Sequence, residues 1–109
     1  MYSRGEIVLI PVPFSDLSAS KKRPVLIISN NSYNARKPDM IVVAITSNVS
    51  QPGIPITTSD MTQGQLPKSS VVRSDKIYTL DQSIVVKSIG HLSASIIDSV
   101  KTSIVSTIS

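Results

Sequence analysis

Arg23 is the residue whose surroundings most clearly indicate chemistry. It ends a run of cations that begins with Lys21 and Lys22, and it is followed by Pro24 and the apolar residues 25–28. The β-branched apolar run predicts a strand in a core, whereas cations without partners are costly to bury. We therefore expect Arg23 in a fixed position at the rim of a sheet. A planar, permanently charged guanidinium in such a position suits recognition of a phosphate.

Arg73 and Asp75 form a second pair of reactive side chains. They lie two residues apart in a predicted strand over residues 70–75, and side chains at this spacing project from the same face of a strand. The simplest interpretation is an ion pair on a solvated face. The alternative is a base and an acid, or a base and a phosphate clamp, held at a fixed separation.

Thr46 and Ser47 place two hydroxyl groups where a predicted strand over residues 40–46 ends. As turn residues they need no further role, but hydroxyls at that position could also hydrogen-bond a phosphate or a ribose. His91, the one histidine of the chain, follows Gly90 shortly before a predicted helix. We interpret His91 as a packing or capping residue and not as a catalyst.

The composition excludes several kinds of chemistry. The 109 residues, which we expect to form one domain over 1–109, include no cysteine, and this excludes disulfides, thiolate catalysis and cysteine-ligated metals. No spaced set of histidines or carboxylates resembles a metal site. A glycine-rich phosphate loop is also missing. We therefore expect neither a metal nor another cofactor.

The charge and hydropathy of the chain favour a polyanionic partner. Eleven Lys and Arg against seven Asp and Glu give a net charge of +4, which suits a polyanion, although a solvated basic surface would give the same excess. The chain has no apolar run of the roughly 20 residues that a membrane span needs, and its start shows no signal-peptide pattern. We expect a cytoplasmic protein without membrane contact.

The hydrophobic pattern predicts a mainly β chain with a C-terminal helix. Five or six short strands, with turns at residues 30–34 and a second basic turn that includes Arg36, indicate a small, strongly bent sheet or barrel. The segment after residue 75 either continues the preceding strand or bends away, and a last strand is expected at 83–88. Expected strands cover residues 6–14, 24–30, 40–46, 54–58, 70–75 and 83–88. A helix is expected after Ser93, because apolar residues recur there at helical spacing, namely Ile96, Ile97, Val100, Ile104, Val105 and Ile108.

Several segments of the chain, in this order, resemble the MazF/PemK family of toxins from type II toxin–antitoxin modules. They are Arg4-Gly5-Glu6-Ile7-Val8, Arg23-Pro24-Val25-Leu26-Ile27-Ile28, Ala44-Ile45-Thr46-Ser47, Val71-Val72-Arg73-Ser74-Asp75 with Thr79-Leu80-Asp81, and the closing Ile89-Gly90-His91-Leu92. Each motif is short, and it is their common order and spacing, over nearly the whole chain, that make the resemblance specific.

The resemblance implies an SH3-like small β-barrel with a C-terminal helix, which forms a homodimer through the helix or through strands. It further implies sequence-selective, metal-independent cleavage of single-stranded RNA and a cognate antitoxin protein as partner. RNA supplies its own nucleophile, the 2′-hydroxyl. Such an enzyme therefore needs only to position that group and to manage protons and charge.

The family's active-site residues correspond to Arg23, Thr46, Arg73 and Asp75. The resemblance implies that Asp75 accepts the 2′-hydroxyl proton and that Arg23 stabilises the negative charge of the phosphorane-like transition state. Arg73 would donate a proton to the departing 5′-oxygen or stabilise its charge, and we favour stabilisation as at least part of the role because arginine rarely gives up a proton. Further RNA contacts are expected from Ser47, Lys21, Lys22 and Arg36.

Residues 16–22 depart from the family pattern. Many members have a longer loop here, with a Glu-Gln pair and a glycine before the Arg-Pro motif, and the PemK branch has a histidine. This chain has Asp16-Leu17-Ser18-Ala19-Ser20-Lys21-Lys22 instead, in which Lys21 or Lys22 could substitute as a cation. The departure keeps a second hypothesis open, a non-catalytic module on the same barrel that grips nucleic acid or a protein.

Overall fold

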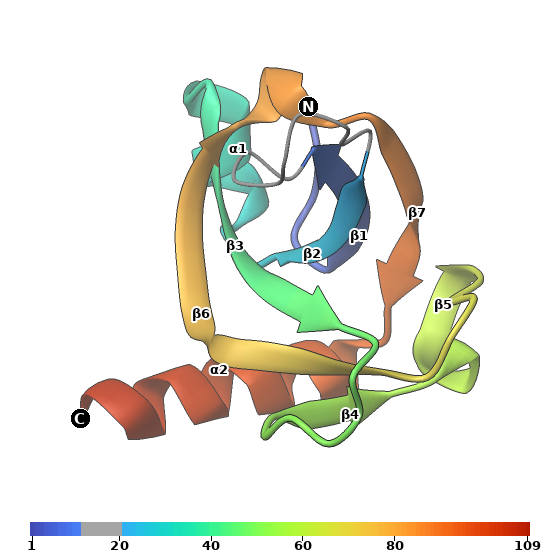
Figure 1. The fold of residues 1–109 in the computed structure, drawn as a ribbon. Helices are drawn as coiled ribbons and strands as arrows, with labels where there is room; N and C mark the ends of the chain where they lie inside the picture. The colour runs from blue at the N-terminus through green and yellow to red at the C-terminus, as the bar shows by residue number, and fades with distance from the viewer. Residues whose placement is uncertain (12–20) are drawn as a thin grey trace.

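The computed structural model describes residues 1–11 and 21–109, which form one curved sheet with the C-terminal helix packed against it (Figure 1). Within these residues no helix has the length and apolar character needed to cross a membrane. The strands are β1 Glu6–Pro11, β2 Lys22–Ile27, β3 Asp39–Thr46, β4 Ile54–Ile56, β5 Met61–Gly64, β6 Ser70–Asp81 and β7 Lys87–Leu92. The helices are α1 Asn31–Arg36 and α2 Ala94–Ile108, with short 3₁₀ helices η1 Thr58–Asp60 and η2 Gln82–Ile84.

All seven strands belong to one antiparallel sheet in the order β4-β6-β3-β2-β1-β7-β5. β3 lies inside this order, between β6 and β2, as expected for its almost wholly apolar sequence. Within the described residues, β4 and β5 are the two edge strands. The sheet between them curls into a half-barrel (Figure 1). The expectation of a mainly β chain with a C-terminal helix is confirmed.

Alternating side chains of the strands form a core on each face of the sheet. On β3, Val43 and Ile45 belong to a first core that α2 covers with Ile97 and Val100. Met40 and Val42, which alternate with them, belong to a second core on the opposite face. Other members of the second core are Val8, Ile10, Val25 and Ile27.

β6 changes its register with β3 in the middle of its length. Val43 pairs with Ile77, whereas the next residue of β3, Ala44, pairs with Arg73. Residues 74–76 therefore bulge out of the ladder, and β6 bends sharply in Figure 1. Bulges increase the local twist and redirect side chains. The sequence left open whether this segment continues or bends, and the structure shows one strand that does both.

Helix α1 occupies the segment that the sequence predicts as turns. Asn30 caps it by accepting a hydrogen bond from the Tyr33 amide (2.8 Å). Asn34 is buried and donates to the carbonyl oxygens of Tyr2 and Ser29, at 3.1 and 3.0 Å. The turn prediction is wrong in extent because these tertiary bonds hold a helix that the local sequence does not indicate.

The last part of the sheet also differs from the prediction. The strand expected at residues 83–88 is replaced by η2 and the later strand β7, because the Asp81 side chain starts η2 by accepting a hydrogen bond from the Ser83 amide (2.8 Å). β5 is a largely exposed strand that the pattern misses. A Cβ on Gly90 would lie only 2.2 Å from the Gln63 carbonyl oxygen of β5, so this pairing depends on glycine.

The C-terminal helix is present as predicted, but its apolar face is only partly covered. Ser93 occupies the N-cap position, without a capping bond from its side chain. Ile97 and Val100 are buried, whereas Val105 and Ile108 are 52% and 74% exposed. The first two turns of α2 therefore do most of the packing.

Leu26, fully buried in the first core, provides a test of this packing. We expect Leu26→Ala to lower the free energy of unfolding by about 2–5 kcal/mol, because transfer free energy is lost and a cavity remains. Urea unfolding measures this value if the m-value stays unchanged. The control Val49→Ala alters a side chain that is 63% exposed and should change stability by less than about 0.5 kcal/mol. Equal effects of the two substitutions would contradict the assigned core.

Candidate active site

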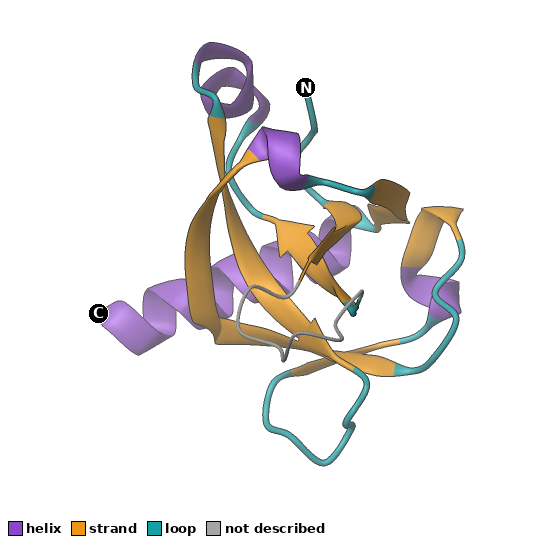
Figure 2. Cartoon of the chain, turned by 45° about the horizontal axis from the view of Figure 1, so that its top comes forward, coloured by secondary structure: helices purple, strands orange, loops and turns teal. Residues whose placement is uncertain are grey.

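Strand pairing brings Arg23, Thr46 and Arg73 to one face of the sheet. Val25 pairs with Ala44, and Ala44 pairs with Arg73. The same antiparallel register, continued by two residues, sets Arg23 opposite Thr46. Residues paired across a sheet share a face, as do residues two apart on a strand. This face also carries the second core and lies opposite α2 (Figure 2).

Ser74 provides an independent check of this orientation. It lies between Arg73 and Asp75, it is buried, and its hydroxyl is 2.7 Å from that of Ser103 on α2. Because successive side chains of a strand alternate, Arg73 points away from the helix, and the Asp75 carboxylate lies on the same side because it accepts hydrogen bonds from Arg73.

Arg23 and Arg73 lie on the two strands that border β3 near Thr46, and Arg73 pairs with Ala44, two residues before Thr46. Adjacent strands lie about 4.8 Å apart, so the backbones of β2 and β6 are separated by on the order of 10 Å at this level. Arg23 is exposed, Thr46 is half-buried, and the Arg73 side chain is 17% exposed. The surface position above Thr46 is therefore within reach of long side chains from both sides.

Arg73 is held by three side-chain hydrogen bonds. Its Nε and Nη2 donate to the two carboxylate oxygens of Asp75, at 3.3 and 3.2 Å. Its Nη1 donates to Oε1 of Gln51 at 2.8 Å. The Arg73–Asp75 contact is the one ion pair in the part of the chain that the structure describes. The geometry agrees with the ion-pair interpretation of the sequence and leaves the chemical one open.

The environment of Asp75 lowers the pKa of its carboxyl below the ordinary value of 3.8. The main cause is the hydrogen bonding from Arg73; partial desolvation opposes it, and the positive charge of Arg73 adds to the lowering. Asp75 is thus ionised at neutral pH but weakly basic while the pair is intact. Because folding lowers this pKa, the pair stabilises the fold above the ordinary carboxyl pKa, and this contribution is lost as the pH falls through the lowered value.

The loop between β3 and β4 connects Thr46 with Gln51. The Asn48 amide donates to Thr46 Oγ1 (3.1 Å), the Ser50 amide to Asn48 Oδ1 (3.2 Å), and the Gln51 amide to the Asn48 carbonyl oxygen (3.1 Å). Short polar side chains that accept nearby amides are typical of tight turns. Thr46 accepts one of these bonds and keeps its hydroxyl proton for a ligand. Ser47 is exposed at the start of the loop.

The other predicted RNA-contacting residues are placed unequally. Lys21 and Lys22 are exposed next to Arg23. Arg36 lies just before the start of β3, whereas Thr46 lies at its end. A strand of 8 residues is about 25 Å long, so the two residues lie far apart. The structure does not bring Arg36 to the cluster, and its RNA contact stays a prediction. Two expectations lie outside the described residues. They are the end of the first strand at residues 12–14 and residues 15–20 of the following loop, which includes most of the departure from the family pattern.

Gln51 is the neighbour of Arg73 that the sequence-based prediction misses. It precedes Pro52 and Gly53 in a polar segment that indicates only a loop. Its partner lies 22 residues away, and no local pattern links the two. The pairing of Ile54 with Val72 in the β4–β6 ladder brings the loop to Arg73.

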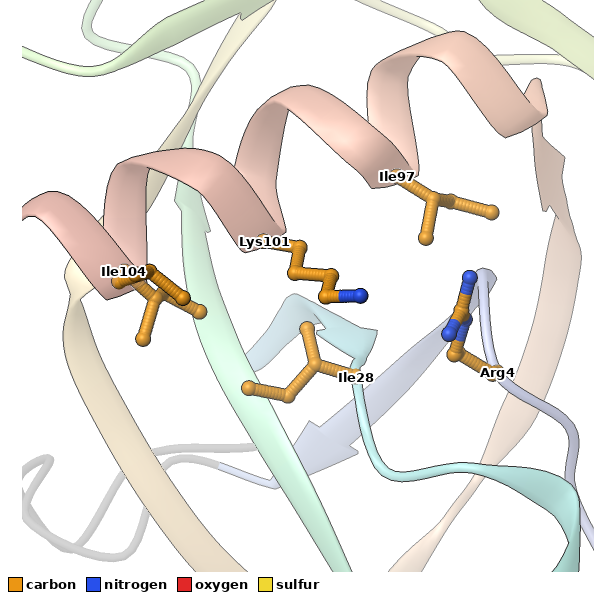
Figure 3. Close-up of a pocket in the computed structure, with 6 residues that line it drawn as sticks. Arg4, Ile28, Ile97, Lys101 and Ile104 are labelled. Atoms are coloured by element: carbon orange, nitrogen blue, oxygen red, sulfur yellow. The ribbon is translucent and has the colours of Figure 1, made fainter.

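His91 and a separate cavity lie outside the group formed by Arg23, Thr46, Arg73 and Asp75. The His91 ring packs against Gly5, and its Nδ1 lies 2.9 Å from the Leu92 carbonyl oxygen, which confirms a packing role. Within residues 1–11 and 21–109, no group of three or more His, Cys, Asp or Glu could hold a metal. A cavity of about 150 Å³ lies beside α2 (Figure 3), and neither Arg23 nor Arg73 lines it. Its lining consists of Arg4, Ile28, Ile97, Lys101, Ile104 and Val105.

Comparisons with known proteins agree with this fold. The family model of PemK-like, MazF-like toxins of type II toxin–antitoxin systems matches residues 3–108. The chain is 36% identical over 106 residues to the endoribonuclease MazF6 of Mycobacterium tuberculosis. The aligned region covers 90% of this chain and 89% of that protein. The M. tuberculosis toxin MazF-mt6 has a similar structure, with a TM-score of 0.70, 25% identity and 91% of each chain covered. An endoribonuclease from a mycobacterial species, in complex with its cognate antitoxin, matches with a TM-score of 0.70 and 20% identity over 97% of this chain and 90% of that one.

These structures share the half-barrel with a C-terminal helix, which is a toxin fold. The chain belongs to the PemK-like, MazF-like toxin family of type II toxin–antitoxin systems, as its motifs predict.

The contact between Arg73 and Asp75 predicts the titration of the Asp75 carboxyl. Carbon-detected NMR of the wild type should give a pKa below 3.8. Arg73→Gln removes the charge and the paired donors, and the pKa should rise. Lys87→Gln is the matched control, because it removes a positive charge from an exposed position on β7 that does not contribute to the lowering, and the pKa should remain low. An Asp75 pKa that is the same with and without the guanidinium would refute the pairing in solution.

Proposed function

We propose that the chain is a sequence-selective, metal-independent toxin that cleaves single-stranded RNA by attack of the RNA 2′-hydroxyl. Its class, a MazF-type endoribonuclease toxin of a toxin–antitoxin module, follows from the family and from relatives named endoribonucleases. The observation that carries the proposal is the strand pairing that places Arg23 on β2 and Arg73 on β6 on the same face of the sheet as Thr46, with β3 between them. Two cations and a hydroxyl around one surface position suit a phosphodiester.

Asp75 accepts the 2′-hydroxyl proton in this proposal. Its resting hydrogen bonds to Arg73 keep it ionised but weakly basic. An RNA phosphate attracts the same guanidinium, and weaker bonding from Arg73 raises the basicity of Asp75. Binding of the substrate thereby prepares the base for its task.

Arg23 and Arg73 stabilise the negative charge that develops as the 2′-oxygen attacks phosphorus and the 5′-oxygen departs. Fixed donors directed at developing charge make a large contribution to many enzymes. Arg73 acts mainly by charge, because a guanidinium holds its protons firmly. Thr46 donates its hydroxyl to a phosphate or ribose oxygen, and Ser47 with the two lysines before Arg23 extends the contact along the RNA. The nucleophile belongs to RNA, so no metal is needed to generate one.

The partners proposed for this chain follow from the family. One mycobacterial relative is known in complex with its cognate antitoxin. For this chain we propose an antitoxin with a flexible acidic segment, which becomes ordered over Arg23 and Arg73 and excludes RNA. A homodimer, formed through α2 or through strands, and a cytoplasmic location complete the proposal.

A non-catalytic binding module on the same barrel is the less favoured function. A module that only grips RNA needs cations but no base beside them. This chain keeps the Asp75 carboxylate in hydrogen-bond contact with a candidate phosphate-binding arginine, on the face opposite α2. That arrangement favours the enzyme.

Cleavage of a long RNA in the presence of a chelator tests the proposal. The wild type should produce fragments with 5′-hydroxyl ends, because the 2′-oxygen displaces the 5′-oxygen. We expect Asp75→Asn and Arg23→Ala each to reduce the rate by at least about 100-fold, through loss of the base and of charge stabilisation.

Lys87→Ala is the control for the change of net charge. Lys87 is exposed on β7, and its replacement should leave the rate within about twofold of the wild type. Intact RNA after incubation with the wild type would favour the binding module. Activity that disappears with the chelator, or fragments with 5′-phosphates, would reject the metal-independent 2′-hydroxyl mechanism.

A further inference from the structure

We infer that Gln51 is a positioning residue of the nuclease reaction, which holds the Arg73 guanidinium from the β3–β4 loop so that Arg73 presents its remaining donors to the RNA phosphate. The inference rests on the proposed function and adds to it a residue that no family motif in this sequence includes. It starts from the 2.8 Å hydrogen bond between Arg73 Nη1 and Gln51 Oε1.

The donors of Arg73 are divided between two acceptors. A guanidinium has five N–H groups in a planar fork. Asp75 takes the Nε proton and one proton of Nη2, and Gln51 takes one proton of Nη1. One N–H remains on each Nη nitrogen, and these donors can serve phosphate oxygens while the Gln51 contact persists.

Asp75 alone is a poor anchor for the guanidinium. Its side chain is 51% exposed, and exposed ion pairs are weak and screened by salt. It also lies within residues 74–76, which leave the β3–β6 ladder at the bulge, so its backbone lacks the support of β3. Gln51 comes from a different element. Its contact restricts Arg73 independently of the bulge.

The loop that carries Gln51 is itself fixed at Thr46. The Gln51 amide bonds to the Asn48 carbonyl oxygen, and the Asn48 amide bonds to Thr46 Oγ1. A chain of contacts therefore leads from Thr46, the proposed phosphate or ribose contact, through the loop to Arg73. A change in loop conformation on RNA binding would alter the position of Arg73. The rate of cleavage would then depend on how well the RNA contacts Thr46 and the loop.

Two substitutions at position 51 separate positioning from binding. Gln51→Met keeps a similar volume but removes the acceptor, and we expect kcat to fall about tenfold while KM changes less than about twofold. Gln51→Glu keeps an acceptor and should recover most of kcat near neutral pH. Its added carboxylate should raise the pKa of Asp75 and move the acid limb of the pH–rate profile upward. Val49→Ala, at an exposed position of the same loop, should behave as the wild type.

An NMR measurement makes the test independent of catalysis. The signals of the Arg73 Nη1 protons should be protected from solvent exchange in the wild type and broadened by exchange in Gln51→Met, with an unchanged urea midpoint. An unchanged Arg73 signal, an unchanged kcat, or a raised KM at constant kcat would each overturn the positioning role. A wild type that leaves RNA intact would instead overturn the proposed function, and the NMR signal would still report whether Gln51 holds Arg73.

Discussion

The bulge of β6 at residues 74–76 is the constraint on which both packing and site depend. Beyond the bulge, β6 runs along the start of β3 and contributes Leu80 to the second core. Before the bulge it runs beside the end of β3 and contributes Val72 to the first core, and Ser74, the first residue of the bulge, packs against α2. Between these two stretches the bulge changes the pairing of β6 with β3. The same bend leaves Arg73 and Asp75 on the face away from the helix, next to the ends of β2 and β3.

The strength of the Arg73–Asp75 pair suits a contact that substrate must loosen. A fully buried pair is strongly destabilising to break, whereas a half-exposed pair contributes little to stability and exchanges partners easily. In this structure the pair keeps Asp75 ionised and Arg73 directed, while the carboxylate stays accessible at 51% exposure. A phosphate can therefore compete for the guanidinium without unfolding any part of the sheet.

Sequence reasoning was sufficient where the relevant contacts are local. The strand ends at Arg23 and Thr46 and the two-residue spacing of Arg73 and Asp75 follow from hydrophobic runs and strand periodicity. Elements held by distant partners were missed. Helix α1 is held in part by a bond from the buried Asn34 to the carbonyl oxygen of Tyr2, 32 residues earlier, and Gln51 meets Arg73 only because β4 pairs with β6. The number of basic residues gives no information on their positions, and Arg36 lies at the end of β3 opposite to Thr46.

The central claim is that an RNA phosphodiester binds across the ends of β2 and β3 and the first half of β6. Amide chemical-shift mapping with a single-stranded oligonucleotide that lacks 2′-hydroxyls, and so cannot be cleaved by this mechanism, tests it most directly. The account predicts shift changes concentrated in residues 21–25, 44–51 and 71–76. Changes confined to α2 and the cavity beside Arg4, or none near Arg23, would contradict it.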